Sequence, residues 1–98
     1  MRRHLPQRRP AQTIDLAFWG QLWHVTVGYY SDGNPGEIFV NAGKRAGTDL
    51  DVMTRDASIL FSLALQHGAP LDVISGALTR NAAGGPGGIM SAIADRLK

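Results

Sequence analysis

The hydrophobic pattern of this chain changes its period once, and this change constrains the fold more than any other feature. Between residues 13 and 42, apolar side chains alternate with polar or small ones in three segments, which is typical of half-buried strands. After residue 48, apolar residues recur every three or four positions, as on amphipathic helices. Strands followed by helices are typical of a segregated sheet and helix layer. The sequence therefore predicts an α+β fold, a three-stranded antiparallel sheet with three helices packed on one face.

Turn-forming residues separate the predicted strands. Gly20-Gln21 suits a two-residue hairpin turn in which the glycine takes a positive φ. Residues 31–36, SDGNPG, are all turn formers and predict the second reversal. The predicted strands are residues 13–18, 23–29 and 37–42.

A long helix is predicted to follow the strands. Thr48, with Asp51 three residues later, fits a capping box at its start, and Gly68 suits the left-handed position after its end. Its apolar residues fall at helical spacing, so we expect it to be the central core helix. The expected core residues are Leu50, Met53, Ala57, Leu60, Phe61, Ala64 and Leu65, with Val52, Ile59 and Leu63 widening the face. Further helices are predicted at 70–79 and, after the glycine-rich residues 81–88, at 89–97.

Positive charge is concentrated at the start of the chain. Arg2, Arg3, Arg8 and Arg9 are four of the ten basic residues, and residues 10–98 carry six basic and eight acidic side chains. Pro6 and Pro10 lie in the same segment, which has no hydrophobic period. We therefore divide the chain into a basic flexible arm, residues 1–12, and a single domain, residues 13–98. The arm fits either a solvated tail or a segment that contacts a polyanion.

Composition excludes several classes of protein. The longest apolar run is far shorter than the ~18 to 20 residues of a membrane span, and no apolar stretch follows the basic start as in a signal peptide. We expect a soluble, cytoplasmic protein without a membrane partner. The sequence has no cysteine, which excludes disulfides, a thiolate nucleophile and a Cys-ligated metal.

Residues 41–48, NAGKRAGT, are the most suggestive candidate site. Two glycines and two cations precede the long helix, whose first backbone amides suit an anion. The order differs from a P-loop, because Lys44 precedes the last glycine instead of following it. The same residues also fit a plain connection between strand and helix. The candidates for anion or nucleotide binding are Gly43, Lys44, Arg45, Gly47 and Thr48.

Other polar residues do not form a recognisable catalytic or metal site. His4, His24 and His67 lie in an arm, a strand and a helix end, without a shared metal-binding spacing. Asp32 and Glu37 fit a turn and a strand surface, and nothing in the sequence positions them as an acid–base pair. We therefore predict no catalytic residue, no metal and no cofactor.

The sheet face away from the helices is unusually aromatic. Trp19, His24 and Phe39 are expected there, which makes them candidates for a protein interface, for example in a homodimer. Alternatively, these side chains wrap round the sheet edges into the core.

Two long segments resemble the TSCPD domain family. They are TVGYYSDGNPGEIFVNAGKRAGTDLD, residues 26–51, and RDASILFSLALQHGAPLDVISGAL, residues 55–78. This small module lies near the C-terminus of cobalamin-dependent (class II) ribonucleotide reductases and also occurs as short stand-alone proteins, which residues 5–9 and 85–89 resemble as well. The cysteine motif that names the domain is absent here, so a thiol or zinc role implied by the resemblance does not transfer.

Three functions are compatible with these features. The first is a non-catalytic accessory module for binding or oligomerisation, linked through the resemblance to ribonucleotide reductase or deoxynucleotide metabolism, with a homodimer or a protein partner. The second is nucleic-acid binding by Arg2, Arg3, Arg8 and Arg9 with the Lys44-Arg45 loop, for which six phosphate contacts give a salt slope of about −5. The third is nucleotide sensing at that loop. We do not expect an enzyme.

Overall fold

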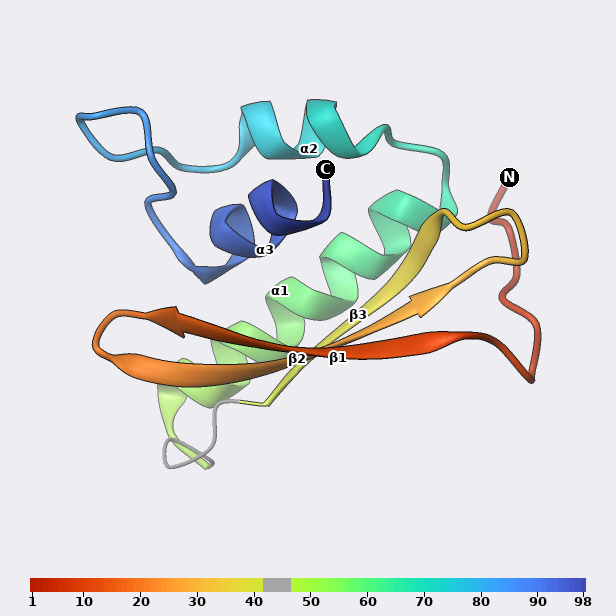
Figure 1. Ribbon diagram of the computed structural model, residues 1–98, viewed down its shortest axis with the longest axis horizontal. Helices are drawn as coiled ribbons and strands as arrows, with labels where there is room; N and C mark the ends of the chain where they lie inside the picture. Colours follow the sequence, from red (N-terminus) through yellow and green to blue (C-terminus); the bar gives the residue numbers. More distant parts are fainter. Residues whose placement is uncertain (42–46) are drawn as a thin grey trace. The chain divides into compact units, whose positions relative to one another are not determined.

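The computed structural model describes residues 1–41 and 47–98 (Figure 1). Three strands precede three helices, which confirms the predicted α+β class. The elements are β1 (Ala11–Phe18), β2 (Gln21–Tyr29), β3 (Pro35–Asn41), α1 (Asp49–Gln66), α2 (Leu71–Ala77) and α3 (Ile89–Leu97). The chain forms two compact units, Met1–Gly68 and Ala69–Lys98, which we describe separately. The division into a flexible arm and one domain stays a prediction.

The sheet has the order β1-β2-β3, and both pairs of neighbours are antiparallel. Successive side chains along each strand point to opposite faces of the sheet, and the apolar ones share one face, as the sequence predicts. One side is buried and carries Ile14, Trp23, Val25, Val27, Ile38 and Val40. The opposite side carries the residues of the other phase, among them His24 and Phe39, which are exposed.

The first hairpin differs from the prediction by one residue. Phe18 pairs with Gln21, so Trp19 and Gly20 form the turn, and both have a positive φ, 51° and 69°. This is the geometry of a type I′ turn, and the prediction of a Gly20-Gln21 turn is wrong. A left-handed φ costs a non-glycine residue about 1 to 2 kcal/mol. The Trp19 ring offsets part of this cost through contacts with Phe18 and Trp23, at centroid distances of 5.0 and 6.2 Å.

Helix α1 turns a polar side inward. Its start is as predicted, because the Thr48 hydroxyl accepts a hydrogen bond from the Asp51 amide. The buried residues of this fully described helix are Asp51, Thr54, Ser58, Phe61, Ser62 and Gln66, so Phe61 is their one large apolar side chain. Four residues that were expected to form or widen the core face are exposed by 55 to 70%, namely Val52, Met53, Ile59 and Leu60. We call these four the α1 patch, and the prediction that they are buried is wrong.

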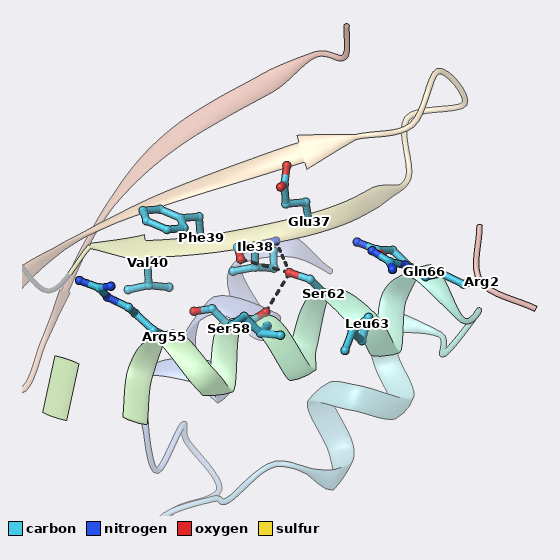
Figure 2. A pocket seen from close by; sticks show the side chains of 11 residues that line it. Arg2, Glu37, Ile38, Phe39, Val40, Arg55, Ser58, Ser62, Leu63 and Gln66 are labelled. Atoms are coloured by element: carbon cyan, nitrogen blue, oxygen red, sulfur yellow. Dashed lines mark hydrogen bonds between the residues drawn. The ribbon is translucent and has the colours of Figure 1, made fainter. Parts of the chain in front are cut away.

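The reason lies in β3, which is an edge strand with outward-facing backbone groups. Ser62 Oγ accepts a hydrogen bond from the Ile38 amide at 2.9 Å and lies 3.1 Å from the Ile38 carbonyl oxygen (Figure 2). Four residues further along α1, Gln66 Nε2 donates to the Gly36 carbonyl at 2.9 Å. Polar side chains of α1 thus bind the backbone groups to which a fourth strand would otherwise pair.

The segment before β1 lies beside the end of α1 and beside the turn between β2 and β3, and Arg3 makes most of the contacts. The Arg3 amide donates to the Gln66 carbonyl at 2.7 Å, and the Tyr30 hydroxyl donates to the Arg3 carbonyl at 2.6 Å. The Arg3 guanidinium lies 3.7 Å from the centroid of the Tyr30 ring and bonds Asp32 at 2.9 Å. These contacts, together with the Arg2 contact described below, position the first three residues against the unit.

In the second unit, an ion pair joins Arg80, which follows α2, to Asp95 of α3, and a hydrogen bond from Ser75 joins α2 to the same carboxylate. The Arg80 guanidinium binds both carboxylate oxygens of Asp95, at 2.6 and 2.7 Å, and the buried Ser75 hydroxyl donates to the same carboxylate at 2.8 Å. Hydrogen bonds from Arg80 and Ser75 hold the pKa of Asp95 well below its usual range. The glycine-rich connection is closed by Asn81, whose Oδ1 accepts from the amides of Ala83 and Gly85. None of the helices in the described ranges is long and apolar enough to cross a membrane.

Candidate functional site

A groove of about 430 Å³ runs between β3 and α1, and we call it the β3–α1 groove (Figure 2). Its volume falls within the range of ordinary ligand sites. Three separate segments form its walls. The lining residues are Arg2 from the N-terminal segment, residues 37–40 from β3, and Arg55, Ser58, Ile59, Ser62, Leu63 and Gln66 from α1.

The buried serines of the groove are already hydrogen-bonded. Ser58 Oγ donates to the Thr54 carbonyl at 2.8 Å, and Ser62 Oγ is bound by the backbone of β3. The lining contains no histidine or cysteine that could act as a base or nucleophile beside them. This arrangement suits binding better than covalent catalysis.

A guanidinium stands at each end of the groove. At one end Arg2 Nε donates to Gln66 Oε1 at 2.6 Å, and the Gln66 amide nitrogen is in turn fixed by Gly36. At the other end Arg55, whose side chain is 62% exposed, makes a longer 3.3 Å contact with Asp51. Figure 2 shows these two arginines at opposite ends of the stretch of α1 that lines the groove.

Between the ends, the β3 wall carries a carboxylate that is already paired. Glu37 Oε2 accepts from Arg9 Nη2 at 2.9 Å and from Arg9 Nε at 3.1 Å. This pair lies over Gly28, where an added Cβ would come within 2.8 Å of the Glu37 carboxylate. The glycine therefore leaves room for the ion pair beside the groove.

The predicted anion loop lies largely outside the described residues, because Gly43, Lys44 and Arg45 are not among them. The two candidates that are described both form a hydrogen bond with Asp51, Gly47 with its carboxylate and Thr48 with its backbone amide. The Gly47 amide donates to Asp51 Oδ2 at 2.9 Å, and Thr48 caps the Asp51 amide. Anion binding at this loop stays a prediction, although the Gly47 amide is already used by Asp51.

The arm arginines proposed for nucleic acid are mostly bound within the chain. Arg2 binds Gln66, Arg3 binds Asp32 and Tyr30, and Arg9 binds Glu37. Arg8 is exposed, and its side chain makes no hydrogen bond or ion pair with any described residue. The arm thus presents fewer unpaired cations than its sequence suggests, and nucleic-acid binding stays a prediction.

The three interface candidates are all at the surface. His24 and Phe39 lie on the open side of the sheet, and Trp19 lies at the tip of the first hairpin. The His24 ring contacts Asp15 across the strand pair at 2.6 Å. The alternative that these side chains enter the core is therefore wrong, and their role in an interface stays a prediction.

Sequence reasoning missed the groove and most of its lining. Its α1 side follows from polar residues that recur every four positions, at Thr54, Ser58, Ser62 and Gln66, inside an otherwise apolar helix. Such a stripe was a usable signal that this side faces backbone groups. Among residues 1–41 and 47–98, no three histidine, aspartate or glutamate side chains converge as in a metal site.

Comparison with known proteins confirms the resemblance found in the sequence. The family model of the TSCPD domain matches residues 2–98. The chain is 37% identical over 73 residues to the vitamin B12-dependent ribonucleotide reductase of Rhodopirellula baltica, and 36% identical over 78 residues to that of Bradyrhizobium diazoefficiens. These matches cover 74% and 80% of the chain but only 7% and 6% of the two relatives. No solved structure matches the chain significantly.

Proposed function

The chain belongs to the TSCPD domain family, and from this premise we propose that it is a non-catalytic module for binding and oligomerisation that acts alongside ribonucleotide reductase. In the relatives named above, the matching region is a small fraction of a much longer reductase. A region of that size is better suited to holding the reductase or its partners than to carrying out the whole reaction.

The observation that carries this proposal is the α1 patch. Four large apolar side chains are exposed within about two turns of α1, while the polar side of the helix faces β3. Contiguous exposed apolar patches of this kind mark interaction sites. Covering the exposed part of each side chain contributes about 1 to 2 kcal/mol, so losing one of them should weaken an interface measurably.

The absence of catalysis is also a proposal. It is supported by the hydrogen bonds of Ser58 and Ser62, which leave no activated hydroxyl in the groove, and by a sequence without cysteine. An assay of the purified chain for ribonucleotide reduction should therefore give no product above background.

The test is self-association measured by sedimentation velocity over a wide range of protein concentration. We expect the wild-type chain to dimerise and Leu60→Glu to be monomeric, because a buried carboxylate opposes the contact. Val73→Glu, at a similarly exposed position on α2, is the matched control and should behave as wild type.

A second arm measures binding of the chain to a purified vitamin B12-dependent ribonucleotide reductase. If the wild-type chain neither self-associates nor binds the reductase, the proposal is refuted. If Val73→Glu disrupts assembly as strongly as Leu60→Glu, the α1 patch is not the contact surface.

A further inference from the structure

We propose that the β3–α1 groove binds a short, extended peptide that carries a negative group near each end and an apolar side chain between them. This site goes beyond the proposed function, because it lies on the β3 side of α1, shares only Ile59 with the α1 patch and does not require self-association. The proposal rests on the length of the groove, the charges at its ends and the apolar surface at its middle.

The length follows from the helix that forms one wall. Arg55 and Gln66, which positions Arg2, are 11 residues apart on α1. At about 1.5 Å per helical residue, the two ends are separated by about 16 Å. An extended peptide advances about 3.3 Å per residue, so about five residues span this distance.

The ends suit carboxylates. The contact of Arg2 with Gln66 uses Nε, and within the described residues its Nη groups donate no hydrogen bond. Arg55 makes one long contact with Asp51 and is mostly exposed, so it can turn toward a ligand at little cost. A guanidinium binds a carboxylate through two parallel, charge-assisted hydrogen bonds.

The middle suits an apolar side chain. Phe39 and Ile59 are exposed by 58% and 57%, and Leu63, four residues after Ile59 on α1, is half-buried. The serine hydroxyls of the groove are already bonded, so they offer little to a polar ligand group. The Glu37 carboxylate on the β3 wall is already paired with Arg9, so Arg2 and Arg55 remain the charged groups of the lining that suit an acidic ligand group.

A two-ended ligand fits better than a nucleotide. A nucleoside phosphate concentrates its negative charge at one end and would leave the distant arginine without a partner. Nucleotide binding is therefore the contrasting outcome that the experiment must distinguish.

The experiment is fluorescence anisotropy of a labelled peptide with the full chain at low ionic strength. The probe is Asp-Ala-Leu-Ala-Glu, amidated at its C-terminus and joined to fluorescein through a glycine spacer. We expect binding that weakens with added salt and falls roughly tenfold in each of Arg2→Gln and Arg55→Gln, as expected for loss of a charge-assisted contact.

Matched controls separate this site from general electrostatic attraction. Arg8→Gln removes an exposed charge from the same N-terminal segment, and Arg96→Gln removes one from α3, so both should bind the probe as wild type does. An isomer with both acidic residues at one end should bind more weakly. Leu60→Glu should retain probe binding, so failure of the groove and failure of the α1 patch give different results.

Three outcomes would overturn the proposal. The first is no binding of the probe at about 1 mM protein, where even weak specific complexes are detected. The second is equal binding of the isomer, or an equal loss in Arg8→Gln, which would indicate diffuse charge attraction. The third is displacement of the probe by ATP with the same dependence on Arg2 and Arg55, which would identify a phosphate site.

Discussion

Replacing Ser62 with alanine should destabilise the first unit by about 2 kcal/mol, because this hydroxyl satisfies the edge of β3. Ser62 Oγ accepts from the buried Ile38 amide at 2.9 Å. Its single proton is shared between the Ile38 carbonyl at 3.1 Å and the Ser58 carbonyl at 2.8 Å. Alanine removes the hydroxyl that accepts from the Ile38 amide and has no polar atom to replace it.

The magnitude combines three effects. A buried donor left without a partner costs about 1 to 3 kcal/mol, and weakening the bond to the Ile38 carbonyl adds about 0.5 kcal/mol. Alanine is the better helix former by about 0.5 kcal/mol, which offsets part of this. The Ser58 carbonyl loses little, because a helical carbonyl is already bound by the amide four residues later.

The assay is urea unfolding followed by tryptophan fluorescence, since Trp23 is fully buried and reports on the sheet. Ser58→Ala is the matched control, because Ser58 Oγ donates only to the Thr54 carbonyl of its own helix. We expect the control to change the free energy of unfolding by less than about 0.5 kcal/mol. If Ser62→Ala is no more destabilising than Ser58→Ala, the hydroxyl does not stabilise the edge of β3 and the reasoning is wrong.

Two further predictions concern glycines and an acid. Gly36→Ala should lower the melting temperature, because an added Cβ would overlap the Tyr30 ring. Gly76→Ala in α2 should instead raise the free energy of unfolding by about 0.5 to 1 kcal/mol, because its Cβ meets no atom within 4 Å and alanine is the better helix former. The lowered pKa of Asp95 means that its ion pair with Arg80 stabilises the fold fully above pH 3.8 and is lost as the pH falls further. Thermal melts between pH 2 and 7 should therefore show a smaller acid-induced loss in Asp95→Asn; an unchanged acid profile would contradict this role.

Much of the fold was predictable because it depends on local patterns. The alternation that defines the strands and the cap at Thr48 are read within a few residues, and the bounds of α1 follow from them. The hairpin turn was missed by one residue, because Gly20 fits either of two registers. Pairing of Phe18 with Gln21 and the ring contacts of Trp19 decide between these registers.

The inward side of α1 could not be predicted from hydrophobic periodicity. That periodicity identifies an apolar side of the helix, and the usual inference is that this side is buried. Here the helix lies against an edge strand, whose amide and carbonyl groups require polar partners such as Ser62 and Gln66. The groove was also hidden, because contacts such as Arg2 with Gln66 join residues 64 positions apart.

The hydrogen bonds of Ser62 and Gln66 to the edge of β3 have a consequence for how copies of this chain can associate. An open edge strand is a template on which another strand can be added, in a dimer or in an aggregate. With the Ile38 amide and the Gly36 carbonyl occupied by helix side chains, extension of the sheet is disfavoured on the β3 side and left to β1. The assembly that we propose through the α1 patch would therefore not compete with addition of a strand at β3.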